Sequence, residues 1–181
     1  GLHAIGKIVS ENSSLHNAAT RLLRTSEWDF MAVYHDMIDH FCHSFMKYHP
    51  PKHPGVDPAN YELFKDAVTG AYIFQDMMLE RTLNLIDKDT TVIVMSDHGF
   101  ESGDKRILNM PKVQAAPSLE HRQFGMFVAC GPNIKENEKI YGLGLIDIGP
   151  TILHHFGLPI GRDMDGKVNL DLFKEPGEVT Y

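Results

Sequence analysis

The chain has little cysteine. Cys42 and Cys130 are the only two such residues among 181, and no Cys-x-x-Cys pair is present. Two widely separated cysteines exclude the dense disulfide framework of small secreted proteins. Nothing in the cysteine content requires an oxidising compartment. Reduced cysteines are compatible with the cytoplasm, while the localisation itself stays unknown.

A long apolar run and an excess of positive charge are also missing. No apolar stretch approaches the roughly 20 residues needed to span a bilayer, and no signal peptide is visible. The formal net charge is −7 and the isoelectric point is near 5.8. This charge disfavours a nucleic acid or an anionic membrane as the partner. The chain opens on Gly1 rather than on methionine, so we expect it to begin inside a longer protein.

The composition does supply a core and an unusual number of histidines. With 43% hydrophobic residues, a chain of 181 residues can bury one substantial core, so a single domain is expected. The sequence shows no internal repeat and no low-complexity linker. Its eleven histidines stand out, because histidine titrates near neutrality and binds metals well.

Helical and extended patterns alternate along the chain. Strands are predicted at 28–34, 91–95 and 124–129, and helices at 11–24, 57–86 and 145–156. A proline-rich segment at 49–55 is predicted to be a loop. Strands separated by helices predict an α/β fold, with a parallel sheet covered by helices on both faces.

The most informative motif follows the predicted strand at 91–95. That run is rich in β-branched residues, as a fully buried strand would be, and Asp97 and His98 stand at its carboxyl end. In an open α/β sheet, ligands and catalytic metals collect at this end of the strands. Gly99 allows the backbone to turn sharply away. The alternative to a metal site is that Asp97 and His98 form an ordinary polar turn after the strand.

A second set of candidate ligands follows the predicted strand at 28–34. Asp39 and His43 are four residues apart, so on a helix they lie on one face and could share a metal. Asp36 and His40 have the same spacing, and the spacing alone leaves both pairs open. A helix cap at Asp36 and solvent-exposed histidines would be the structural alternative.

His121, just before the last predicted strand, could complete a three-ligand set. Together with Asp39 and His43 it would give a site of two histidines and one carboxylate, with a coordination position left open. Asp97 and His98 would then form half of a second site. Two metals about 3.5–4 Å apart can stabilise both the attacking and the leaving oxygens at phosphorus.

These motifs resemble, in order and context, the type I phosphodiesterase/nucleotide pyrophosphatase family of the alkaline phosphatase superfamily. Tyr34 stands five residues before Asp39, as in that family. The resemblance extends over about residues 28–173 and includes the segments Ser96-Asp97-His98-Gly99, Cys130-Gly131-Pro132 and Asp163-Met164-Asp165-Gly166-Lys167.

The resemblance implies an alkaline phosphatase-like fold, with three α/β/α layers and a mostly parallel sheet. Residues 1–181 would be the C-terminal part of a single catalytic domain whose N-terminal half is absent. The implied activity is metal-dependent hydrolysis of phosphate esters, as a phosphodiesterase or nucleotide pyrophosphatase. Small-molecule phosphate esters or nucleotides are the implied substrates. The resemblance implies no oligomeric state.

The resemblance also implies ligand roles. It favours the pair Asp39/His43 over the pair Asp36/His40. It assigns Asp39, His43 and His121 to one metal, and Asp97 and His98 to the other. Two divalent ions are implied, with zinc expected and manganese or iron as alternatives.

One part of the family pattern is missing. The family's Thr or Ser nucleophile begins a helix, and a further Asp ligand ends the first core strand. Ser13, Ser14 and Thr20 lie in a helical region with no strand-terminal Asp before them. We therefore expect the nucleophile upstream of this chain and expect the fragment alone to be inactive. Alternatives are a non-catalytic metal-binding domain, or a sibling enzyme such as a sulfatase, phosphonate hydrolase or phosphoglycerate mutase.

Overall fold

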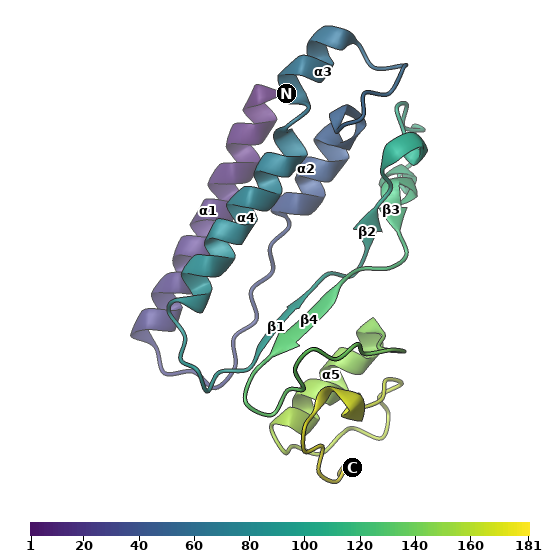
Figure 1. Ribbon diagram of the computed structural model, residues 1–181. Helices are drawn as coiled ribbons and strands as arrows, with labels where there is room; N and C mark the ends of the chain where they lie inside the picture. The colour runs from purple at the N-terminus through teal and green to yellow at the C-terminus, as the bar shows by residue number, and fades with distance from the viewer. The chain divides into compact units, whose positions relative to one another are not determined.

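A computed structural model describes residues 1–181, which divide into two compact units (Figure 1). The first unit consists of Gly1–Asp87 and His98–Phe124. The second consists of Lys88–Asp97 and Gly125–Tyr181. The assignment of both to one catalytic domain stays a prediction. No helix combines the length and the apolar character that crossing a membrane requires.

The first unit is built mainly from helices. These are α1 (Leu2–Thr25), α2 (Met37–Phe45), α3 (Pro58–Phe64) and α4 (Ala67–Leu83). The short helix α2 packs against both α1 and α4, which run beside it (Figure 1). Its apolar residues Met37, Phe41, Cys42 and Phe45 are all buried in the core of this unit. Burial of this apolar face is the main source of stability for a helix of nine residues.

Two of the predicted helices differ in extent from the prediction. Helix α1 begins at Leu2 rather than near residue 11, because Ile5 and Ile8 continue its apolar face toward the N-terminus. The helix predicted over 57–86 is divided into α3 and α4. Its predicted start is confirmed: the Asp57 carboxylate accepts a hydrogen bond from the Asn60 amide at 2.9 Å.

The strand predicted at 28–34 is wrong, because this segment forms no strand. Two of its three aromatic residues, Phe30 and Tyr34, are 57% and 78% exposed. The only strands of the first unit, β2 (Gly99–Phe100) and β3 (His121–Arg122), pair with each other. A short apolar run specifies neither burial nor a hydrogen-bonded neighbour, and a strand needs both.

The second unit contains β1 (Val92–Met95), β4 (Phe127–Cys130) and α5 (Leu145–His155). The strand predicted at 91–95 is therefore confirmed, and the one predicted at 124–129 begins three residues later. The helix predicted at 145–156 is also confirmed. It is followed by Gly157 at a φ of 66°, the left-handed conformation that favours glycine after a helix.

The prediction of a fold that mixes helices and strands is confirmed, but the parallel three-layer sheet is not. Strands β1 and β4 pair antiparallel, and so do β2 and β3, in two separate two-stranded sheets. The sequence pattern indicates where strands and helices lie. It does not specify which strands pair, because pairing depends on contacts between residues far apart in the chain.

Candidate metal centre

Helix α2 contributes two of the predicted ligands. Its apolar residues, including Phe41 and Phe45, face the core, and Asp39 and His43 lie one turn apart on another face. The Asp39 Oδ1 and His43 Nε2 atoms are 3.4 Å apart. The i, i+4 spacing recognised in the sequence therefore does bring these two groups together.

The small sheet of β2 and β3 contributes two histidines. His98 directly precedes β2, and His121 is paired with Phe100 in the antiparallel register. The rings of His98 and His121 are stacked, with centroids 3.6 Å apart and an angle of 12° between their planes. Phe100 lies edge-on to both rings, at centroid distances of 5.5 and 5.0 Å, and so fixes them from one side.

The Asp39 carboxylate on α2 lies close to the histidines of the β2–β3 sheet. Its Oδ1 lies 3.4 Å from His43 Nε2, 3.6 Å from His98 Nε2 and 3.7 Å from His121 Nε2. The ligand atoms of Asp39, His43 and His121 all lie within 4.8 Å of one another. Residues separated by up to 82 positions in the chain are thus brought to one place.

The donor atoms fit a cation. Asp39 Oδ1 is buried and accepts no hydrogen bond. His43 Nδ1 lies 2.7 Å from Glu120 Oε2. Because a carboxylate has only acceptors, Nδ1 carries the proton, and in the neutral ring Nε2 presents a lone pair toward Asp39. An unpaired carboxylate oxygen facing an imidazole lone pair is unfavourable without a positive charge nearby.

The spacing of the two nitrogens is also compatible with a metal. His121 Nε2 lies 3.0 Å from His43 Nε2. Two nitrogens held at 2.0–2.1 Å by one tetrahedral zinc ion would be about 3.3 Å apart. In the metal-free chain His121 Nε2 can donate a hydrogen bond to the His43 lone pair, and a metal would take the place of that proton.

Cys42 neighbours the site but does not belong to it. Its side chain is fully buried on α2. Burial raises the pKa of the Cys42 thiol to about 12, with further contributions from the carboxylates of Asp39 and Glu120. The Cys42 thiol is not part of the group of converging ligand atoms, which belong to Asp39, His43 and His121. The candidate centre therefore consists of nitrogen and oxygen ligands.

The other candidate ligands lie outside the group formed by Asp39, His43 and His121. Asp97 belongs to the second unit and His98 to the first, so the joint role of this pair stays a prediction. The alternative pair, Asp36 and His40, is about half exposed, with Oδ2 and Nε2 3.9 Å apart. It belongs to no group of three or more potential ligands.

Sequence reasoning missed Glu120. In the sequence it stands out only as the residue before His121, whereas its carboxylate pairs with a histidine 77 positions away. A possible signal was present: a carboxylate adjacent to a predicted ligand can orient another ligand of the same metal.

Comparison with known proteins gives one match. The sequence model of the type I phosphodiesterase / nucleotide pyrophosphatase family matches residues 4–141, which is more than half of the chain. The matched range includes all five predicted ligands: Asp39, His43, Asp97, His98 and His121. Searches of curated proteins and of solved structures found no match.

Proposed function

The chain belongs to the type I phosphodiesterase/nucleotide pyrophosphatase family, and from this premise we propose that it carries metal ligands of a phosphodiester hydrolase. At the level of the family the activity is hydrolysis of phosphate esters. The observation that carries the proposal is the convergence of Asp39, His43 and His121 around a buried carboxylate oxygen that accepts no hydrogen bond.

Asp39, His43 and His121 would hold one divalent cation. Three protein ligands leave a coordination position open, as catalytic metal sites require. His98, whose Nε2 is 3.6 Å from Asp39 Oδ1, would hold a second cation together with Asp97. Such ions supply Lewis acidity that polarises a phosphoryl oxygen and stabilises the charge that develops there.

The ligand set favours zinc. Two imidazoles and one carboxylate form a common catalytic zinc site, and the group of converging ligand atoms includes no thiol. Manganese and iron also accept imidazole and carboxylate ligands and are the alternatives. The substrate would be a small phosphate ester or a nucleotide, in keeping with the family.

The nucleophile is proposed to lie outside these 181 residues. The hydroxyl groups of Ser13, Ser14 and Thr20 each donate to a carbonyl one turn earlier within α1, at 2.7, 2.9 and 2.9 Å. None of them stands at the start of a helix. The chain alone would then bind metal without turning over phosphodiesters, and residues outside it would complete the three-layer parallel sheet.

Metal content tests this proposal. After reconstitution with zinc and dialysis, elemental mass spectrometry is expected to find at least about one zinc per chain in the unchanged protein. His121→Ala removes a ligand and should lose that metal. His40→Ala is the matched control, because it removes a partly exposed histidine of the alternative pair and should keep the metal.

Two results would contradict the proposal. One is a zinc content unchanged by His121→Ala. The other is a loss of zinc in His40→Ala with retention in His121→Ala, which would indicate the Asp36/His40 pair.

A further inference from the structure

We propose that Glu120 is a positioning residue that holds His43 in the orientation and tautomer in which Nε2 can bind the metal. This inference rests on the proposed function, because it concerns the same site. It adds a residue that is not itself one of the metal ligands.

The contact between Glu120 and His43 is short and protected. Glu120 Oε2 lies 2.7 Å from His43 Nδ1, and the Glu120 side chain is 12% exposed. The carboxylate can only accept, so the proton stays on Nδ1 and Nε2 is left as the metal-binding atom. A ring flip would put Cδ2 in the place of Nδ1 opposite Glu120 and Cε1 in the place of Nε2 at the metal site. The hydrogen bond therefore fixes both the ring and its tautomer.

The backbone around Glu120 is itself fixed. The Glu101 amide donates to the Glu120 carbonyl at 2.8 Å, extending the ladder in which Phe100 pairs with His121. His121 is thus anchored as a ligand on the same short segment that anchors Glu120. The start of β3 would thus supply one ligand, His121. It would also orient a second ligand, His43, through the Glu120 carboxylate.

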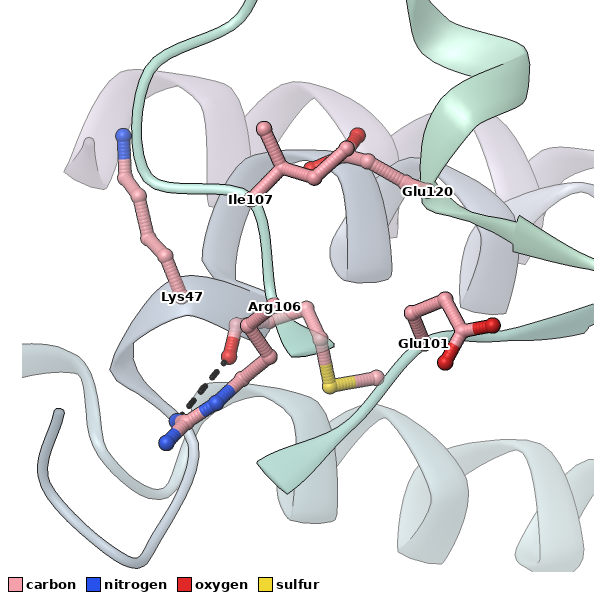
Figure 2. Close-up of a pocket in the computed structure, with 6 residues that line it drawn as sticks. Lys47, Glu101, Arg106, Ile107 and Glu120 are labelled. Atoms are coloured by element: carbon pink, nitrogen blue, oxygen red, sulfur yellow. Dashed lines mark hydrogen bonds between the residues drawn. The ribbon is translucent and has the colours of Figure 1, made fainter. Parts of the chain in front are cut away.

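The one buried side chain with a positive charge, Arg106, is occupied elsewhere. Arg106 donates to the carbonyl oxygens of Gly103 at 2.6 Å, of Pro51 at 2.5 Å and of His49. Figure 2 shows the Arg106 guanidinium and the carboxylates of Glu101 and Glu120 pointing in different directions around a small pocket. The Glu120 carboxylate is thus paired with His43 and not with Arg106.

A carboxylate behind a metal-binding histidine has two effects. It orients the ring, and it makes Nε2 more basic by stabilising the positive charge that the ring acquires on binding a cation. Loss of such a partner typically weakens metal binding by roughly 10–100-fold. A carboxylate that served only to join α2 to the sheet would change the folding stability and leave the tautomer of His43 unaffected.

The first test is a competition titration with Co²⁺ on the full chain. Glu120→Ala should weaken binding by roughly 10–100-fold, and Glu120→Gln, which keeps an acceptor but not the charge, should weaken it less. Glu101→Ala is the matched control: it removes a carboxylate from the residue paired with Glu120 and should bind Co²⁺ as the unchanged chain does. The d–d absorption of bound Co²⁺ should change in the Glu120 variants alone.

The second test uses the metal-free chain and separates positioning from folding. Nitrogen-15 spectra at pH 8 should show His43 as a single Nδ1–H tautomer in the unchanged chain and as a mixture in Glu120→Ala. If Glu120→Ala does not fold, Glu120→Gln carries both measurements. Equal Co²⁺ affinity and an unchanged tautomer in the Glu120 variant would overturn this inference alone. Failure of the unchanged chain to bind Co²⁺ would overturn the proposed function as well.

Discussion

The Asp39 carboxylate illustrates how a site can cost stability at the scale of one residue. A buried polar atom without a hydrogen bond typically destabilises a fold by about 1–3 kcal/mol, and Asp39 Oδ1 is such an atom. Its neighbour His43 presents a lone pair rather than a proton. The arrangement is unfavourable without metal and becomes favourable with it.

Asp39→Asn should therefore separate stability from function. The neutral amide removes the buried carboxylate oxygen that has no partner, so the metal-free variant should be more stable than the unchanged chain by roughly 1 kcal/mol. The same change removes a charged ligand and should abolish zinc binding. Chemical unfolding in the presence of a chelator measures the first effect, and elemental mass spectrometry measures the second.

The matched control is Asp36→Asn, one turn earlier on a partly exposed carboxylate, which should change neither quantity. A metal-free Asp39→Asn chain that is clearly less stable than the unchanged one would show that Asp39 stabilises the fold without a cation.

The candidate ligands could be found from sequence because their signals are local. Asp39 and His43 are one helical turn apart, and His98 comes three residues after the end of a strand that the sequence shows clearly. The role of Glu120 could not be found in this way. It depends on a contact across 77 positions, and that contact exists only once α2 and the small sheet pack together.

At the scale of elements, the N-terminus of α5 depends on one carboxylate. Asp147 accepts hydrogen bonds from the Gly144 amide at 2.8 Å and from the Lys167 amide at 2.7 Å. It thereby caps the helix and ties the segment around Lys167 to it. These two hydrogen bonds, that of Lys167 first, hold the pKa of Asp147 below its usual value of 3.8.

Asp147→Ala should lower the free energy of unfolding at pH 7 by about 1 kcal/mol, as loss of a helix cap does. Because the pKa is lower in the folded state, this stabilisation is present above the unfolded-state pKa and is lost as the pH falls through the folded-state pKa. The difference between variant and unchanged chain should thus shrink below pH 3.8. Urea unfolding followed by far-ultraviolet ellipticity measures it.

Asp165→Ala removes a nearby exposed carboxylate and serves as the control. A difference between Asp147→Ala and the unchanged chain that persisted undiminished at pH 2 would show that the stabilisation does not depend on the charged carboxylate.

Elements with strong local signals were predicted correctly. The Asp57 cap, the β-branched strand β1 and the glycine after α5 each depend on a few adjacent residues. The strand expected at 28–34 failed because a hydrophobic run carries no information about a neighbouring strand. The helix expected over 57–86 is interrupted near Lys65 and Asp66, where no proline or glycine marks the break.

At the scale of the whole molecule, strand pairing is what the sequence did not reveal. The antiparallel pairs β1–β4 and β2–β3 join segments 20 or more residues apart, and nothing in either partner alone specifies the other. The motifs, in contrast, identified the family that the comparison confirms over residues 4–141. Chemistry concentrated in a few residues is easier to recognise than topology, which is spread over many contacts.

The most direct test of the metal centre is X-ray absorption at the zinc edge, on the chain loaded with one equivalent of zinc. The proposal predicts nitrogen and oxygen ligands at about 2.0–2.1 Å with the multiple scattering of two imidazoles, and no sulfur at about 2.3 Å. In His121→Ala the multiple scattering should fall to that of one imidazole. A sulfur ligand, or a shell of oxygens without imidazole, would contradict the site formed by Asp39, His43 and His121.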